Sequence, residues 1–245
     1  MKIALIGYGK MGQEIERVLA DTKHTVVSVS YRTMSDSLDT TGIKEADVAV
    51  DFTSPEIVVK NIETVLSLGT NMVVGTTGWY DHLRSVEGLA KKYKRGLMYG
   101  QNFSIGANVF FQIAGFAAKL FAKFPDYDIG GIEYHHNAKK DSPSGTAKKL
   151  ADIIMIHNKA KKKLVSGSLN RQIKKEELHF ASLRVGRYFG FHEVLFDSTS
   201  DTVSLSHTAH NRTGFAKGAL WAAEFIKGKK GLYSFDEVFK KEMLT

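Results

Sequence analysis

Cysteine is absent from the 245 residues of the chain. This absence excludes disulfide bonds and thiolate metal sites, and it suits a reducing cytoplasm. A long apolar run is also lacking, because residues 1–7 are too short for a signal peptide and the stretch 107–122 is interrupted by Asn108, Gln112 and Lys119. We therefore expect a cytoplasmic protein without a membrane span.

The chain has fewer acidic than basic residues: it contains 26 Asp and Glu residues and 34 Lys and Arg residues, and its net charge is +8. A basic chain can bind nucleic acid, but these lysines are spread along the sequence without interleaved aromatic residues or a nucleic-acid-binding motif. We expect no nucleic-acid partner. We interpret the lysines, including Lys161–Lys163, as solvated faces that attract anionic small molecules. The hydrophobic fraction of 43% and the length predict a globular protein of one or two domains.

The amino-terminal segment contains a dinucleotide-binding pattern. A short strand, 2–6, leads directly into a G-x-G-x-x-G motif, and helical spacing follows over 13–20. In this context the first glycine permits a tight turn, the second lets the backbone approach a pyrophosphate and the third lets the helix pack on the strand. A glycine-rich turn without a ligand is the alternative. The motif residues are Gly7, Tyr8, Gly9, Lys10, Met11 and Gly12.

The end of the second predicted strand, 25–30, bears on the choice of cofactor. An NAD-selective site usually carries Asp or Glu here to bind the ribose hydroxyls, and none occurs between residues 25 and 35. Arg32, with Thr33 and Ser35 nearby, is suited to a 2′-phosphate instead. We predict that NADPH is preferred, with use of NADH left open. A plain loop cation is the alternative interpretation of Arg32.

Further strands in the first half are each followed by small or polar residues. Strands 71–74 and 96–99 lead into the turns 75–78 and 100–104, and such turns at the carboxyl ends of parallel strands meet ligands. Strand 47–52 leads into a helix that Thr53 or Ser54 is expected to cap ahead of Pro55. These repeated units predict an α/β fold with a doubly wound parallel sheet of the Rossmann type.

The pattern changes after Ser104. Hairpin-like connections at 186–190 and 198–201 indicate an α+β domain with a mixed, mostly antiparallel sheet. A helix over 213–226 then returns to the first domain. We divide the chain into a dinucleotide-binding domain, 1–104 completed by 213–245, and a second domain, 105–212. The elements predicted in the second domain are helices 107–124 and 146–160 and strands 129–134, 178–184, 192–197 and 202–209.

The segment 133–147 gathers groups suited to binding and protonating a dianion. His135 and His136 are at the end of a predicted strand and point to opposite faces, and Lys139 adds an ammonium that can pass a proton if burial lowers its pKa. Ser144–Thr146 has the composition of a helix start whose free amide groups bind a carboxylate or phosphate. Taken singly, a surface histidine pair, a solvated lysine face and an ordinary N-cap are the alternatives.

Over nearly its whole length the sequence resembles the dihydrodipicolinate reductase family of the diaminopimelate and lysine pathway. The most specific feature is the string E-x-H-H-x-x-K-x-D-x-P-S-G-T-A at 133–147. The glycine motif alone would not be specific. Other segments that fit the family are 51–53, 75–78, 102–104, 184–192 and 207–215.

The resemblance implies a nicotinamide-dependent reductase that acts on a cyclic dicarboxylate. His135 would be the catalytic acid and base, Lys139 a second proton donor, and a homotetramer would form through the sheet of the second domain. No metal is expected. The sequence departs from the family at Lys10, where arginine is frequent, and at the missing acidic residue after the second strand. Substrate would contact His136, Gly145 and Thr146, and the cofactor would contact the glycine motif with Gly75, Thr76, Thr77, Gly100, Gln101, Asn102 and Phe103.

Two other functions are compatible with such a fold. The first is a two-domain oxidoreductase related to aspartate or homoserine dehydrogenases, which would turn over its own substrate. The second is a redox-sensing protein that binds a dinucleotide without turnover, which the intact His-His-x-x-Lys set disfavours. We assign Trp79, Tyr80 and the Phe-rich helix 109–124 to packing.

Overall fold

The computed structural model describes residues 1–31 and 38–244. Arg32, and with it the predicted 2′-phosphate contact, lies outside the described residues. The chain forms two compact units, one made of Met1–Ile105 and Arg212–Thr245 and the other of Gly106–Asn211. Among the described residues, no helix is both long and apolar enough to cross a bilayer.

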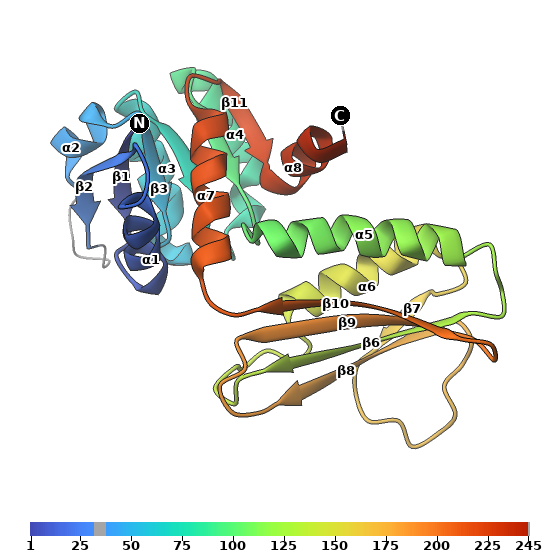
Figure 1. Ribbon diagram of the computed structural model, residues 1–245. Helices are drawn as coiled ribbons and strands as arrows, with labels where there is room; N and C mark the ends of the chain where they lie inside the picture. The colour runs from blue at the N-terminus through green and yellow to red at the C-terminus, as the bar shows by residue number, and fades with distance from the viewer. Residues whose placement is uncertain (32–37, 245) are drawn as a thin grey trace. The chain divides into compact units, whose positions relative to one another are not determined.

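The first unit contains a six-stranded, fully parallel sheet, which confirms the predicted Rossmann-type architecture (Figure 1). The chain moves outward from β1 in one direction to β2 and in the other through β3 to β4 and β5. The carboxyl ends of β1 and β3 therefore form a topological switch point, where open α/β sheets bind ligands. The strand order is β11 (Gly231–Ser234), β5 (Gly96–Tyr99), β4 (Asn71–Val74), β3 (Val48–Asp51), β1 (Lys2–Ile6) and β2 (Thr25–Ser30).

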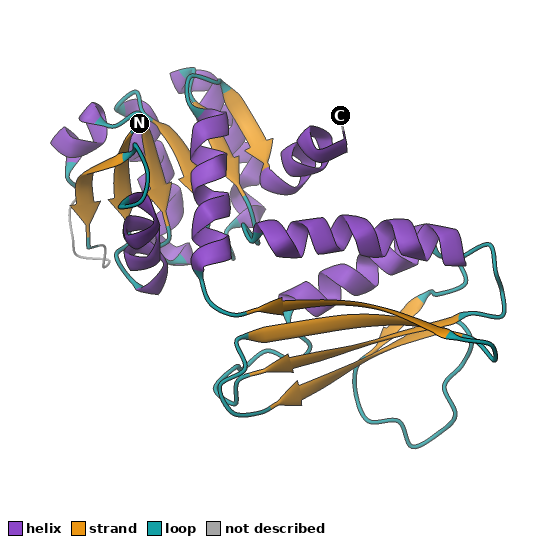
Figure 2. Cartoon of the chain, viewed as in Figure 1, coloured by secondary structure: helices purple, strands orange, loops and turns teal. Residues whose placement is uncertain are grey.

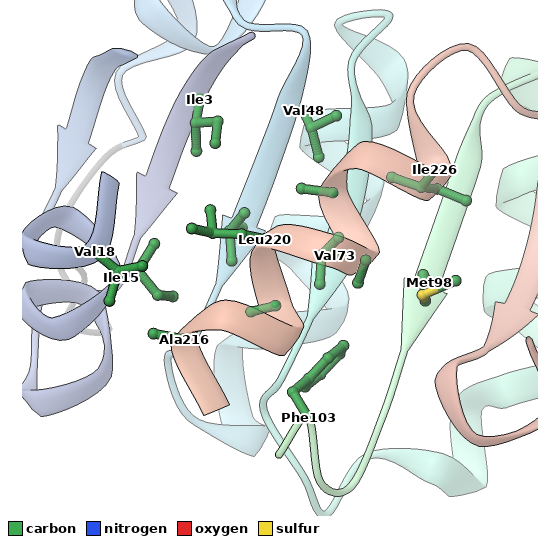
Figure 3. Packing of buried hydrophobic residues seen from close by; sticks show 14 of the residues in the cluster. Ile3, Ile15, Val18, Val48, Val73, Met98, Phe103, Ala216, Leu220 and Ile226 are labelled. Carbon is green, nitrogen blue, oxygen red and sulfur yellow. The ribbon is translucent and has the colours of Figure 1, made fainter. Parts of the chain in front are cut away.

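Helices cover both faces of this sheet because neighbouring residues of each strand point to opposite sides. Ile3 and Leu5 of β1 pack in one core with α1 (Lys10–Leu19), α7 (Thr213–Ile226) and α8 (Phe235–Leu244), part of which Figure 3 shows. Ala4 and Ile6 pack in the other core. That second layer consists of α2 (Thr40–Glu45), α3 (Pro55–Ser67), the 3-10 turn η1 (Tyr80–His82) and α4 (Leu83–Tyr93).

The second unit contains a five-stranded sheet, which is mixed as predicted and includes one strand, β7, in addition to the four predicted strands. Its neighbours pair antiparallel along β10–β9–β6 and parallel along β6–β8–β7. Helices α5 (Ile105–Phe121) and α6 (Gly145–His157) pack on one face of the sheet (Figure 2). The strand order is β10 (Thr202–Ala209), β9 (Gly190–Asp197), β6 (Asp128–His135), β8 (Glu177–Arg184) and β7 (Lys163–Val165).

One of the two predicted hairpins is wrong. The segment 186–190 does not join paired strands, because β6 lies between β8 and β9. The sequence indicates the turn, but it cannot show that β6, about 50 positions earlier in the chain, lies between the two strands that the turn connects. Local propensity carries no information about the pairing of strands this far apart in the sequence. The hairpin at 198–201 is confirmed, since Ser198 N–H donates to the carbonyl of Asp201 at 3.0 Å.

Lys161 is not on a solvated face, and its interpretation as one is wrong. The residue is only 5% exposed. Its ammonium donates to the carbonyl oxygens of Lys175 and Glu177 at 3.0 and 2.7 Å and pairs with Asp128 at 2.5 Å. These partners come from distant segments, which is why the basic run in the sequence gives no sign of them.

Packing explains only part of the Phe-rich helix. Phe110 and Phe111 of α5 are buried against the sheet. Phe116 is 63% exposed and Leu120 is 43% exposed. The helix is therefore apolar on more than the face that the second unit covers.

Candidate functional site

The turn between β1 and α1 has the conformation that its glycines suggest. Gly7 adopts φ +86°, and a Cβ there would lie 2.5 Å from the carbonyl oxygen of Phe52. A Cβ on Gly12 would lie 2.4 Å from the carbonyl oxygen of Gly7, so only glycine lets the helix pack this closely. The space beside Gly9 is open to at least 4 Å. Two of the glycines thus shape the turn, and the third leaves its outer side free.

A cavity of about 420 Å³ lies at the switch point of the sheet. It brings together the glycine motif, the end of β3 and the turn after β4, as the sequence predicted for Gly75, Thr76 and Thr77. Its position at the amino-terminal end of α1 suits an anion, because the first amide groups of a helix lack intrahelical partners. The residues that line it are Gly9, Lys10, Met11, Phe52, Thr53, Pro55, Gly75, Thr76 and Thr77.

A buried carboxylate holds two walls of this cavity together. Asp51, at the end of β3, accepts hydrogen bonds from the hydroxyls of Thr53 at 2.7 Å and Thr76 at 2.9 Å and from the amide of Asn61 at 2.8 Å. The Thr53 N–H donates to Asp51 and to the Thr76 hydroxyl. Burial raises the pKa of Asp51, and the hydrogen bonds oppose this rise. The Thr53 hydroxyl therefore bonds Asp51, and the side chain of Ser54 makes no capping hydrogen bond, although Pro55 begins α3 as predicted.

Other residues predicted to contact a cofactor lie outside the lining of this cavity. The side chain of Phe103 is 2% exposed and packs on Phe235 at 4.6 Å between ring centroids, so only its backbone is available to a ligand. Asn102 accepts a hydrogen bond from Ser104 N–H at 2.8 Å. The Tyr8 hydroxyl donates to Glu16, and Gly100 and Gln101 follow β5. The cavity is thus lined by residues 9–11 and 75–77, and residues 100–103 lie beside it, because Gly100 N–H donates to the Val74 carbonyl at 3.2 Å and the rings of Phe103 and Phe52 have centroids 6.2 Å apart.

In the second unit, polar side chains form a row across four strands. Glu133 of β6 lies directly opposite Ser182 of β8 and His192 of β9, and His192 lies opposite His207 of β10. Because side chains alternate along a strand, His135 shares the face of Glu133, the face that also carries the buried Ile129 under α5 and α6. These polar side chains lie at one end of the layer between the sheet and helices α5 and α6, and the rest of that layer is apolar.

His135 has defined partners at both ring nitrogens. Its Nδ1 lies 3.2 Å from the carbonyl oxygen of Phe189, which can only accept, so Nδ1 carries a proton. Its Nε2 lies 3.3 Å from His192 Nε2 and 3.4 Å from Glu133 Oε2. The side chain keeps 11% of its surface exposed. Nε2 therefore faces the Glu133 carboxylate and the His192 ring.

Glu133 is fully buried and supplies the negative charge of this cluster. Burial alone would raise its pKa, but the adjacent imidazoles of His135 and His192 and the hydrogen bond from Ser144 outweigh burial and hold the pKa of Glu133 well below its usual range. Oε1 accepts from the N–H of Ser144 at 2.9 Å, and Arg184 Nη2 lies 3.1 Å away. Burial lowers the pKa of His192, and the adjacent Glu133 carboxylate opposes this fall. A fixed carboxylate thus faces two imidazoles.

The other predicted site residues follow in the same segment. Ser144 caps α6 as predicted, because its Oγ accepts from Ala147 N–H at 3.1 Å, and Gly145 and Thr146 form the first turn. Lys139 pairs with Asp141 at 2.7 Å and keeps 23% of its side chain exposed. His136 follows the end of β6 and is half-buried. A cation, imidazoles and a helix amino terminus are therefore all present in the second unit.

Sequence reasoning missed Glu133, His192, Ser182 and Arg184 as parts of this cluster. Glu133 was in the family string but received no role. An available signal was that Glu133 and His135 are two residues apart on one strand and so share a face. His192 could not be found locally, because its place depends on which strands are neighbours.

Family models match the chain over two consecutive ranges. The model described as dihydrodipicolinate reductase, N-terminus, matches residues 1–103, and the one described as dihydrodipicolinate reductase, C-terminus, matches residues 106–239. The 4-hydroxy-tetrahydrodipicolinate reductase of Christiangramia forsetii is 37% identical over 240 residues, which are 97% of this chain and 97% of that one. The same-named protein of Rickettsia bellii is 35% identical over 95% of this chain and 91% of its own.

A solved structure agrees with these relatives. The dipicolinate-bound dihydrodipicolinate reductase from Paenisporosarcina sp. TG-14 superimposes with a TM-score of 0.78 at 26% identity, over 97% of this chain and 99% of that chain. The similarity therefore extends over both units. The chain belongs to the dihydrodipicolinate reductase family.

Proposed function

We propose that the protein reduces 4-hydroxy-tetrahydrodipicolinate to tetrahydrodipicolinate in diaminopimelate and lysine biosynthesis, with a reduced nicotinamide dinucleotide as hydride donor. The observation that carries the proposal is the cluster in which the Glu133 carboxylate, fully buried, faces His135 Nε2 at 3.4 Å. The rest of the family string lies in the same unit. The names of the relatives supply the substrate, and a dicarboxylate ring is consistent with the dipicolinate bound in the Paenisporosarcina structure.

The cofactor would bind in the first unit. The residues present fit a dinucleotide, because the open space beside Gly9 and the helix amino terminus suit its pyrophosphate. Lys10 adds a cation at the rim, and Gly75 to Thr77 form the facing wall. When bound, the reduced nicotinamide would supply a hydride to the unsaturated ring of the substrate.

The second unit would bind and protonate the substrate. The free amide groups of Gly145 and Thr146 at the start of α6 suit one carboxylate, and Lys139 and His136 suit the other. His135 would donate a proton from Nε2 to the atom of the substrate ring on which negative charge develops. Its Nδ1 would keep its own proton, which is hydrogen-bonded to the Phe189 carbonyl. Glu133 supplies a counter-charge to the imidazolium before transfer. Lys139 would act as a second proton donor.

The decisive experiment is an assay with freshly generated product of dihydrodipicolinate synthase. We expect consumption of NADPH and NADH that depends on this substrate, with a higher kcat/KM for NADPH. The preference rests on Arg32 and on the missing acidic residue between positions 25 and 35. Tight binding of the dinucleotide with no turnover of this substrate would overturn the proposal in favour of a binding protein. Turnover of another dehydrogenase substrate would favour the related oxidoreductases.

We also infer that the protein is a cytoplasmic homotetramer that associates through the second sheet. The face of this sheet opposite α5 and α6 carries apolar side chains, and Leu183 is 49% exposed. Tyr134 and Phe191 stack on that face with ring centroids 4.9 Å apart. Apolar surface of this kind is typical of an association surface. The side chains on this face include Ile132, Tyr134, Leu183, Phe191 and Leu195.

A further inference from the structure

Three atoms with lone pairs meet at one point in the second unit. Glu133 Oε2 lies 3.4 Å from His135 Nε2 and 3.3 Å from His192 Nε2, and the two Nε2 atoms are 3.3 Å apart. No other set of three or more His, Asp or Glu ligand atoms this close occurs in residues 1–31 and 38–244. The three atoms therefore form a nearly equilateral triangle.

The size of this triangle matches a zinc site. Zn²⁺ binds imidazole nitrogen and carboxylate oxygen at about 2.0–2.2 Å in tetrahedral geometry, which places neighbouring ligand atoms about 3.3–3.6 Å apart. All three measured edges have this length. One tetrahedral position is left, as in zinc sites that keep a water or another small ligand.

The protons of the cluster are arranged for a cation. Glu133 Oε2 is buried and makes no hydrogen bond of good geometry, although its nearest polar neighbours are the two imidazoles. The Phe189 carbonyl holds the proton of His135 on Nδ1, which leaves the lone pair of neutral His135 on Nε2. The Ser144 hydroxyl, which accepts from Ala147 N–H, lies 3.1 Å from His192 Nε2 and can donate to it, so a cation bound at this nitrogen would take the place of that hydrogen bond. A cation bound to these three atoms would replace the contacts that they make with one another.

We propose that Glu133, His135 and His192 form a binding site for a divalent cation of the Zn²⁺ class, and that the cation reversibly inhibits the protein by occupying Nε2 of His135. A site of one carboxylate and two imidazoles, without thiolate, favours Zn²⁺ over Mg²⁺ or Ca²⁺. The cation and the proton compete for the same nitrogen. The inhibitory part rests on the proposed function, whereas the binding part does not.

The binding test uses untagged protein freed of metal with a chelator, and it probes the site with Co²⁺ and Zn²⁺ alone. We expect one equivalent of Co²⁺ to give the visible absorption of a four-coordinate ion, and one equivalent of Zn²⁺ to displace it. Replacement of either partner, Glu133→Gln or His192→Gln, should weaken Zn²⁺ binding more than about 100-fold, beyond the 10- to 100-fold carried by residues that only orient ligands. The matched control is His179→Gln, a histidine of β8 that bonds the Gly167 carbonyl.

A second measurement does not depend on how well the variants fold. In the unmodified protein, Zn²⁺ should shift the Nε2 resonances of two of the nine histidines in ¹⁵N spectra and leave the others in place. Shifts of other histidines, or binding that is equal in Glu133→Gln, His192→Gln and His179→Gln, would show adventitious surface binding and overturn the proposal. Absence of saturable binding would also overturn it.

The inhibition test separates this proposal from the proposed function. We expect Zn²⁺ to inhibit the reductase in competition with the dicarboxylate substrate, and a chelator to restore full turnover. Stoichiometric Zn²⁺ binding in a protein without reductase activity would refute the proposed function but would still support the metal site. Full reductase activity with the site saturated by Zn²⁺ would refute the inhibitory role of the cation.

Discussion

At the scale of single residues, His135 is expected to determine the rate of proton transfer. We predict that His135→Gln lowers kcat by about 100-fold or more, the range in which general acid catalysis contributes, and leaves the affinity for NADPH unchanged. The affinity should persist because the cavity beside Gly9 lies in the other unit. Steady-state kinetics and fluorescence titration with NADPH measure the two effects. His179→Gln serves as the control, and normal turnover of His135→Gln would show that the acid is misassigned.

Gly190 lets the backbone of β9 approach the imidazole of His135. A Cβ at this position would lie 3.1 Å from Cε1 of His135, closer than ordinary van der Waals contact. Gly190→Ala should push the ring by a few tenths of an ångström and lower kcat by up to about 10-fold, because a displacement of about 1 Å can cost about 100-fold. Gly167→Ala is the matched control, since no atom lies within 4 Å of its added Cβ. Equal kcat values for the two variants would contradict the prediction.

The residues of the candidate site were not equally predictable. His135 and Lys139 stand in a string whose residue types indicate their chemistry. His192 stands 57 positions from His135, and the two meet only because β9 pairs with β6. Tertiary pairing of this kind is absent from local spacing, so the sequence predicts the acid but not the groups that surround it.

At the scale of elements, Asp51 connects the end of β3 to the turn after β4. We predict that Asp51→Ala raises the KM for NADPH several-fold and leaves kcat nearly unchanged at saturation. The reason is that Thr53, Thr76 and Asn61 lose their common acceptor, and each buried donor left without a partner costs about 1–3 kcal/mol. Kinetics and thermal unfolding measure the loss. Asp81→Ala, on the exposed turn η1, is the control, and an unchanged KM for NADPH in Asp51→Ala would refute the role.

An ion pair ties the loop before β8 to that strand. Arg171 donates two hydrogen bonds of 2.8 Å to Glu177, and this contact lowers the pKa of Glu177 from 4.5 to about 2. Because the pKa is lower in the folded state, the pair stabilises the fold above pH 4.5 and this contribution is lost as the pH falls from 4.5 towards about 2. Glu177→Gln should therefore flatten the pH dependence of Tm in that range. Its exposed neighbour provides the control Glu176→Gln, and equal slopes for Glu177→Gln and the unmodified protein would contradict the prediction.

Elements with strong periodicity were predictable, and short ones at the edges were not. The helix 213–226 has the predicted bounds because its apolar residues recur at helical spacing along its length. The strand β11 has four residues, all half-buried, and lies at the edge of the sheet, paired only with β5. Its strand conformation depends on this pairing, so no pattern in residues 231–234 predicts the strand.

At the scale of the whole molecule, the apolar face of the second sheet is expected to set the oligomeric state. A charge placed on this face would have to be buried without a partner when copies associate, which is strongly unfavourable. We predict that Leu183→Glu shifts the mass in solution from four chains towards the single-chain mass of 27.2 kDa. Multi-angle light scattering after size-exclusion chromatography measures the mass.

The control for this prediction is Ile156→Glu, which introduces the same charge at another exposed apolar position of the second unit. Ile156 is 61% exposed and lies on α6, in the helix layer on the other side of the sheet. Its variant should keep the mass of the unmodified protein. If Leu183→Glu retains four chains, or if Ile156→Glu dissociates them equally, the association surface lies elsewhere. If the unmodified protein is a single chain at all concentrations, the homotetramer is refuted, and the apolar face then has a different role.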